Sequence, residues 1–292
     1  MITIQHCAEQ LDELVNFVSR LNSDGKHHIG FFGEGEADVR TSLAECLIPA
    51  GDGFQMAYDG NRLVGIFGVD ADPEVDRAWL FGPLVEHTDW VRIADQLYAE
   101  ILPLIPAGIH DYDLFCDEHN GPVADFALRH GFSLRSENAV LTLKRENYRP
   151  ASQRNSAIID YQDDFFEQFE NIHRNLFPNA YFTARQVVEK QDQNHRLYLA
   201  VEDSRLLGYH FCKIEPESSS GYVDFIGTDV SARGRGTGAD LLAAGLDWML
   251  YTPSTLKINL TVNADNIPAR NLYQKFGFTT HRVMCAYRKR IH

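Results

Sequence analysis

The sequence predicts a mixed α/β protein made of two tandem domains, each with a mixed sheet. The chain of 292 residues is long enough for two domains of about 150 residues each. Three segments of the first half also recur in the same order in the second half, which indicates two copies of one fold. The matching segments are 56–65 with 199–208, 94–102 with 239–247, and 120–132 with 266–278, at offsets of 143, 145 and 146. We therefore expect domains at 1–147 and 148–292, joined by a polar linker at about 145–156.

The second copy alternates strands and helices. Strands are expected at about 156–161, 197–202, 205–214, 221–229 and 256–263, with a final strand pair within 278–290. Helices are expected at about 163–176, 182–191, 237–250 and 266–276. The last helix should begin after Asn266 as its N-cap, carry Pro268 in its first turn and stop at Gly277. This order is typical of a mixed α/β fold.

Composition excludes several classes of protein. The amino terminus has no signal-peptide pattern, and no apolar run approaches the roughly 18 residues of a membrane span, so we expect a cytoplasmic protein without membrane contact. Five scattered cysteines without a C-x-x-C pair argue against a disulfide framework and against zinc, so no metal site is expected.

Nearly all of the net charge lies in the first half. Residues 1–147 hold 10 Lys and Arg against 25 Asp and Glu, a net charge of −15, whereas residues 148–292 hold 17 against 16, a net charge of +1. Because nucleic acid is bound through clustered Lys and Arg, we expect no nucleic-acid partner. A polyanionic small ligand would prefer the second half.

A glycine-rich stretch, "ARGRGTGADLL", connects a predicted strand to a predicted helix at residues 232–242. Backbone N–H groups and a helix N-terminus can converge on an anion at such a junction, and glycine lets a phosphate approach the backbone closely. The spacing matches neither G-K-[ST] nor the dinucleotide fingerprint G-x-G-x-x-G. Taken alone, the stretch fits a flexible turn equally well.

A second pattern near the end of the chain decides between these readings. Together with R-x-x-G-x-G, the segment "NADNIPARNLYQKFGF" resembles the GNAT superfamily of acetyl-CoA-dependent N-acetyltransferases, whose pattern N-x-x-A-x-x-L-Y-x-x-x-G-F is met here from Asn266 to Phe278. Thr228 stands where that family usually has valine. The resemblance is strong over residues 150–292 and reaches the first half through the repeat. It implies two tandem GNAT-like domains, of which the first is degenerate, as in two-copy bacterial members of the superfamily.

The resemblance implies that the second domain binds acetyl-CoA as its acetyl donor. Backbone groups on the strand would hold the pantetheine arm, an amide near Thr228 would polarise the thioester carbonyl, and Asn266 would bond the same arm. The strand residues concerned are Ile226, Gly227, Thr228 and Val230. The pyrophosphate would lie on the loop formed by Arg233, Gly234, Arg235, Gly236, Thr237 and Gly238.

Two residues are candidates for the chemistry. Tyr273 lies seven residues, or two helical turns, after Asn266, so both face one side of the helix. The resemblance implies that its phenol reaches the sulfur as a general acid. Its alternative role is an aromatic core residue. Asp224 could act as general base, directly or through a water relay, because an alkyl amine of pKa about 10.4 is neutral in roughly one molecule in 2,500 at pH 7. Its alternative is a solvated strand carboxylate.

The first copy lacks these features. It has "TDWVRI" at residues 88–93 in place of the glycine loop, and Ala127 in place of Tyr273. We therefore expect it to bind no acetyl-CoA and to form one wall of an acceptor cleft, where its acidity would favour a cationic amine. Carboxylates on ordinary solvated faces would explain the acidity equally well. His173, His210 and His281 are expected to be surface or satisfied histidines.

The expected activity is transfer of an acetyl group from acetyl-CoA to a primary amine of a small molecule or peptide, by direct attack in a ternary complex. A non-catalytic acyl-CoA-binding or sensor protein is the alternative, and a purely structural module is the weaker one. The chain is expected to be a monomer, in which the two domains form a pseudo-dimer, or a homodimer.

Overall fold

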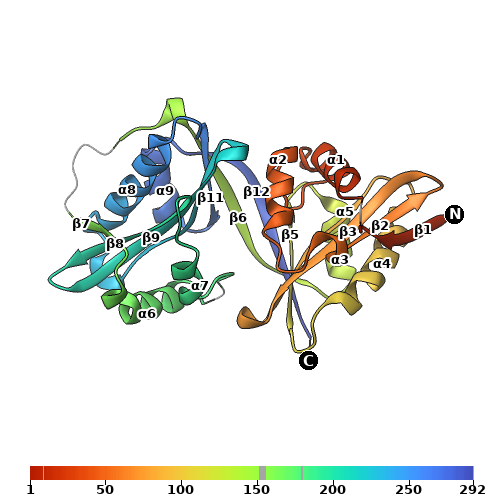
Figure 1. Cartoon of the computed structure of the whole chain (residues 1–292), viewed down its shortest axis with the longest axis horizontal. Coiled ribbons are helices and arrows are strands. Elements are labelled where there is room, and N and C mark those ends of the chain that lie inside the picture. The colour runs from red at the N-terminus through yellow and green to blue at the C-terminus, as the bar shows by residue number, and fades with distance from the viewer. Residues whose placement is uncertain (9, 151–155, 179, 292) are drawn as a thin grey trace. The chain divides into compact units, whose positions relative to one another are not determined.

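The chain forms two compact units in the computed structural model (Figure 1). The structure describes every residue except 9, 151–155, 179 and 292, so the predicted linker at about 145–156 lies partly outside the described residues. Unit 1 comprises Met1–Asn138 and Val283–His292, and unit 2 comprises Ala139–Arg282. Residues 139–147 and 283–292 thus lie in the opposite unit from the one that a single cut between residues 147 and 148 would give them.

Unit 1 is a mixed sheet with helices on both faces. Its strands follow the order β1-β2-β3-β4-β5-β12, with β1 Ile2–His6, β2 Phe54–Asp59, β3 Arg62–Asp72, β4 Arg77–Val85, β5 Asp111–Asp117 and the second half of β12 Thr279–Arg290. Its helices are α1 Leu11–Asn22, α2 Glu36–Ala44, α3 Ala50–Gly53, α4 Trp90–Ile101 and α5 Gly121–Arg129. Aromatic rings fill both faces: Phe67 of β3 packs on Tyr98 of α4 and Phe126 of α5, whereas Phe54 packs on Phe81 and Phe32.

Unit 2 repeats this plan. Its strands follow the order β6-β11-β10-β9-β8-β7, with the second half of β6 Ser133–Lys144, then β11 Lys257–Asn263, β10 Ser220–Thr228, β9 Arg205–Glu215, β8 His195–Glu202 and β7 Ala157–Asp160. Its helices are α6 Phe166–Leu176, α7 Ala184–Glu189, α8 Thr237–Tyr251 and α9 Ile267–Lys275. Apolar residues of α8 and α9 form one buried cluster, and residues of α6 and α7 form another.

The predicted elements of the second copy are confirmed to within a few residues, with one exception. The turn between β8 and β9 places Asp203 and Ser204 at φ 49° and 63°, and Asn266 caps α9 by accepting the Ala269 N–H at 3.2 Å. The predicted final strand pair is wrong, because Thr279–Arg290 is one strand of 12 residues. That segment contains no Gly, Pro, Asn or Asp to form a tight turn.

Each unit contains one strand from the other half of the chain. In unit 1, β12 pairs antiparallel with β5, from Met284 opposite Asp117 to Arg290 opposite Asp111. In unit 2, β6 lies beside β11, where the Thr142 hydroxyl donates to Asn259 Oδ1 at 2.8 Å. The two strands are therefore exchanged between the two halves of the repeat.

Because of the exchange, replacing two equivalent glycines by alanine should lower the free energy of unfolding by different amounts. Gly131 and Gly277 follow α5 and α9 at φ +79° and +100°, and a Cβ at Gly131 would meet nothing within 4 Å, whereas one at Gly277 would lie 2.1 Å from the Asn147 carbonyl oxygen. Gly131→Ala should lower the free energy of unfolding by about 1 kcal/mol, because alanine is strained in the left-handed conformation. Gly277→Ala should cost about 3 kcal/mol or more, because a backbone carbonyl must move as well. Urea unfolding of both variants measures the difference, and equal losses would contradict the close approach of Asn147.

Candidate functional site

The ladder between β10 and β11 stops before either strand ends. The last pair is Val223 with Leu260, although β10 continues to Thr228 and β11 to Asn263. A β-bulge in β10 lies at this point, between Val223 and Phe225, and bulges bend the strand that carries them. We call the opening bounded by residues 224–228 of β10 and 261–263 of β11 the strand gap.

Backbone groups of β10 point into the strand gap. The Asp229 N–H donates to the Leu207 carbonyl of β9 at 2.8 Å, in register with Thr228 opposite Gly208. Because backbone groups alternate in direction along an antiparallel ladder, the N–H and C=O of Thr228 and of Ile226 point away from β9. They are therefore available to a ligand in the gap.

Asp224 lies at the bulge, where the side-chain alternation of β10 is reset. Val223 packs in the cluster of α8 and α9, and Phe225 packs in the cluster of α6 and α7, although residues two apart in a regular strand share a face. Asp224 is half-buried and close to Cys212 of β9. Burial, and secondarily the Asp224 charge, raises the pKa of the Cys212 thiol well above its usual value.

The glycine-rich loop forms a cradle ahead of α8. Gly234 and Gly236 adopt φ +74° and +89°, conformations that disfavour other residues, and a Cβ at Gly234 would meet nothing within 4 Å. Gly236 is the N-cap of α8 and supplies no side-chain cap, while its carbonyl accepts the Ala239 N–H at 2.9 Å. The N–H groups of Thr237 and Gly238, at the start of this 15-residue helix, could therefore bind an external anion such as a phosphate.

The polar side chains of the loop differ in their exposure and in their partners. Arg233 is exposed, and among the described residues it has no ion-pair partner. Arg235 pairs with Glu202 at 2.5 and 3.1 Å, so part of its charge is already neutralised. Thr237 is buried, with its hydroxyl 3.4 Å from that of Ser156. Of the two arginines, Arg233 therefore has the guanidinium that is more available to an anion in the cradle.

Gly238 connects the cradle, the strand gap and α9. A Cβ on Gly238 would lie 3.7 Å from Thr228 Cγ2 and 3.7 Å from Leu272 Cδ2. The start of α8, the end of β10 and the middle of α9 therefore meet at one place. That meeting point brings together the predicted phosphate loop, the predicted strand groups and the helix that carries Asn266 and Tyr273.

Asn266 and Tyr273 have different surroundings on α9. The Asn266 side-chain oxygen already accepts the Ala269 N–H, and its amide NH2 is the group that can donate to a ligand. Tyr273 is buried with 6% of its surface exposed, and its ring packs against Phe278 at 5.8 Å. Burial raises the pKa of Tyr273 to about 12, so the phenol stays protonated at neutral pH and keeps a proton to donate.

Of the three histidines named above, His173 and His210 have structural roles. Nδ1 of His173 lies 2.6 Å from the Tyr209 hydroxyl, and its Nε2 lies 2.9 Å from the Phe182 carbonyl oxygen. His210 is fully buried below α8, with Nδ1 2.8 Å from the Leu241 carbonyl oxygen and its ring filling the space that a Cβ on Gly245 would need. His281 is exposed. No sequence pattern identified His210 as the residue that packs under α8.

The buried His210 predicts a loss of stability in mild acid. Burial lowers its pKa from 6.5 to about 4, so between these values the unfolded chain binds a proton that the folded chain does not. Its contribution is present above pH 6.5 and is lost as the pH falls toward 4, at about 1.4 kcal/mol per pH unit. Urea unfolding from pH 7 to pH 5 should show this slope. His210→Asn should reduce it, and His281→Asn, at an exposed position, should leave it unchanged.

Unit 1 has the same opening between β4 and β5, but its own chain fills it. The ladder of β4 with β5 covers only residues 77–79 and 111–113. Beyond it, Ile29 forms a bridge with Cys116, the Gly30 N–H donates to the Phe115 carbonyl at 2.7 Å, and the Asp117 N–H donates to the His28 carbonyl at 3.1 Å. We call residues 28–32 the plug.

Buried amides hold the plug in place. The Asn22 side chain, fully buried, accepts the Ile29 N–H at 2.6 Å and donates to the Gly33 carbonyl at 2.9 Å. Asn120, the counterpart of Asn266, donates to the His28 carbonyl at 3.3 Å. Unit 1 also has Pro83 where unit 2 has Ile226, so one gap-facing N–H is missing there.

The start of α4 in unit 1 differs from the cradle of α8. Its N-cap is Asp89, in place of a glycine with positive φ, and the Asp89 carboxylate pairs with Arg92 at 2.6 Å. A carboxylate at this position would repel a phosphate.

Among the described residues no helix is both long enough and apolar enough to cross a membrane. No group of three or more His, Cys, Asp or Glu side chains in that part of the chain could hold a metal ion.

Comparison with known proteins agrees with this geometry. Residues 163–278 match the model of the acetyltransferase (GNAT) family. A mycothiol acetyltransferase of Mycobacterium avium is 36% identical over 104 residues, which are 31% of this chain and 33% of that protein, so the chain spans about a third of the length of the curated relatives it matches.

Solved structures extend the likeness to the whole chain at the level of the fold. A GCN5-related N-acetyltransferase from Sphaerobacter thermophilus has a TM-score of 0.73 at 12% identity, covering 99% of this chain and 95% of that chain. A tandem GNAT protein from the clavulanic acid biosynthesis pathway has a TM-score of 0.66 at 17% identity, covering 99% of this chain and 98% of that chain. The chain therefore has a tandem GNAT fold, and residues 163–278 of its second unit match the acetyltransferase (GNAT) family.

Proposed function

We propose that unit 2 transfers an acetyl group from acetyl-CoA to a primary amine, by direct attack of the amine in a ternary complex. The observation that carries the proposal is the junction at Gly238, where an anion cradle and a strand gap with free backbone groups meet. The pyrophosphate would bind the loop from Arg233 to Gly238, and the pantetheine arm would lie in the gap beside Ile226 and Thr228.

The plug of unit 1 supports this placement of the pantetheine arm. Its backbone donates to a carbonyl whose counterpart in unit 2 is that of Thr261, and it accepts from groups whose counterparts are the N–H of Asn263 and the side-chain amide of Asn266. An extended chain with amide groups therefore fits such a gap. Pantetheine is an extended chain of that kind.

The chemistry is assigned to groups beside the gap. The Thr228 N–H would polarise the thioester carbonyl, and Asp224 would take the proton of the attacking amine, directly or through water. Tyr273 would protonate the departing thiolate of CoA. The proton removed at the amine and the one delivered to sulfur balance the transfer.

The acceptor is proposed only as a class. The relatives are named mycothiol acetyltransferase, so the first acceptors to test are the amine whose acetylation gives mycothiol and mycothiol itself, within a panel of polyamines, amino sugars and peptide N-termini. Mass spectrometry should show an acetyl gain on one acceptor class. Binding of acetyl-CoA without turnover of any amine would favour the sensor alternative.

Titration calorimetry should give one acetyl-CoA per chain. The reason is that the plug fills the gap of unit 1, Pro83 lacks the N–H, and Asp89 stands at the start of α4. Two sites of similar affinity would contradict the assignment of unit 1 as degenerate. No binding at all would contradict the proposed function itself.

A further inference from the structure

We infer that the exchange of β6 and β12 between the units is directed by side chains on both faces of these strands, chiefly by the pair Arg288–Asp113 and by Leu143. Because the two halves of the chain are copies of one fold, two strand pairings are possible. β6 and β12 are both 12 residues long, and their partner strands β5 and β11 are both 7 residues long. Each strand could complete either sheet. In the unexchanged pairing, each strand would complete the sheet of its own half of the chain, so some feature must favour the exchanged pairing.

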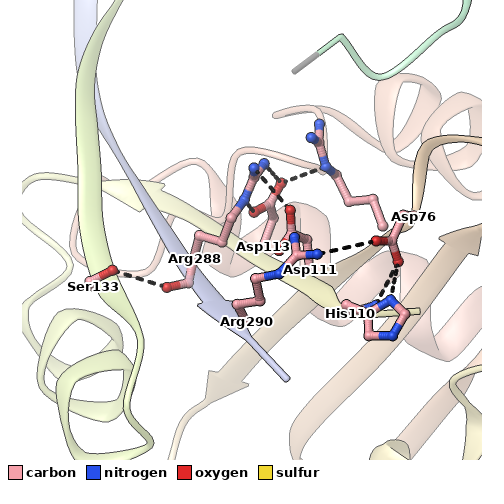
Figure 2. Close-up of polar contacts among 8 residues, drawn as sticks. Asp76, His110, Asp111, Asp113, Ser133, Arg288 and Arg290 are labelled. Carbon is pink, nitrogen blue, oxygen red and sulfur yellow. Dashed lines mark hydrogen bonds and ion pairs between the residues drawn. The ribbon is translucent and has the colours of Figure 1, made fainter. Parts of the chain in front are cut away.

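The first discriminating contact is the ion pair in unit 1 (Figure 2). Arg288 of β12 donates to both carboxylate oxygens of Asp113 at 2.6 and 2.8 Å, and Arg77 of β4 approaches the same carboxylate at 3.3 Å. Arg288 and Asp113 have 17% and 16% of their side-chain surfaces exposed. A pair that is this buried and bidentate is costly to break on one side only.

Unit 2 has neutral residues at the equivalent positions. Thr142 replaces Arg288 and Asn259 replaces Asp113, at an offset of 146, and these two side chains share a hydrogen bond of 2.8 Å. Unexchanged pairing would put Arg288 against Asn259 and Thr142 against Asp113. The guanidinium would lose its carboxylate, and the carboxylate would keep only Arg77.

The outer charges at the strand ends belong to the same network. In the exchanged pairing Arg290 bonds Asp111 at 2.9 Å, and Arg288 also donates to Asp111 at 3.3 Å. The unexchanged pairing would put Lys144 against Asp111, which keeps one attraction at that position but loses the contact from Arg288. The inner position therefore carries the larger difference between the two pairings.

The opposite face of the strands supplies a second contact. Leu143 of β6 is fully buried in the cluster of α8 and α9. Its counterpart in β12 is Lys289, whose ammonium lies 5.9 Å from the centre of the Phe132 ring in unit 1. Unexchanged pairing would bring this lysine into the apolar cluster of unit 2, where burial of an ammonium is unfavourable. Both faces therefore favour the exchange.

The test moves the ion pair between the partner strands. D113N/N259D alone should weaken the exchanged pairing, because Arg288 then finds its carboxylate on β11. Adding T142R/R288T should restore it, since an arginine at position 142 then faces an aspartate at position 259. D95N is the matched control, because it also converts a carboxylate of unit 1 to an amide, but the partners of Asp95 are Arg129 and His130, which belong to neither exchanged strand.

Each full-length protein carries a protease site in place of residues 151–155, which lie outside the described residues, and is cut there before gel filtration. In the exchanged protein each unit holds a strand of the other fragment, so the fragments should elute together. D113N/N259D should lose most of this co-elution, with a melting temperature lower by roughly 5 °C or more. The four-substitution variant should recover both. D113N/N259D behaving like D95N, or no recovery in the four-substitution variant, would overturn the inference.

Discussion

Acetyl-CoA should bind at least about 100-fold more weakly, a loss of about 2.8 kcal/mol, to a protein that carries Gly236→Val and Gly238→Val. Valine at position 236 would force a branched side chain into φ +89°, and its bulk would stand where a phosphate must approach the backbone. A Cβ at Gly238 would make ordinary contacts of 3.7 Å with Thr228 and Leu272, so the fold has room for a first carbon there. The loss of binding would come mainly from the cradle.

Gly108→Val is the control for backbone strain. Gly108 lies in unit 1 at the same φ of +89°, and a Cβ there would meet nothing within 4 Å. This variant should lose comparable stability in thermal unfolding and keep its affinity for acetyl-CoA in calorimetry. Unchanged affinity in the double variant would show that the loop is only a turn.

Tyr273→Phe should lower kcat by about 10² to 10⁴ and change the affinity for acetyl-CoA little, if the phenol protonates the leaving thiolate. The ring and its packing on Phe278 are kept, and only the proton donor is removed. Because the pKa of Tyr273 is about 12, ionisation of this group should not reduce the wild-type rate below about pH 11.

Tyr98→Phe is the matched control for this substitution. Tyr98 is buried to a similar extent, 5% exposed against 6%, and burial raises its pKa to about 12 as well, but it lies in unit 1. Its kcat should equal that of the wild type. An unchanged kcat in Tyr273→Phe would assign Tyr273 to packing alone.

The fold was predictable where local patterns decide it. Asn266, Pro268 and Gly277 set the bounds of α9 in the way their residue types indicate, and the alternating segments of unit 2 became strands. Strand exchange was not predictable, because β6 and β12 have the same length and position in the repeat. The choice depends on long-range partners such as Asp113 and Asn259, which a local pattern does not contain.

The candidate site was also predictable only in part. The cradle followed from the spacing of Arg233, Gly236 and Gly238, because glycine is needed wherever the backbone must bind an anion closely. The bulge at Asp224 and the plug in unit 1 carried no sequence signal. A bulge leaves the strand composition unchanged, and the plug is a loop whose position is fixed by the distant side chains Asn22 and Asn120.

The exchanged strand also sets the order in which the two units can be completed during synthesis. Residues 283–290 leave the ribosome after all of residues 1–282, so unit 1 must wait for its last strand while unit 2 is synthesised, on the order of ten seconds. During that time the edge of β5 is open to other chains, and an open edge is a site of aggregation. Asp111 and Asp113 place negative charge on that edge, which would keep nascent copies apart until Arg288 and Arg290 arrive.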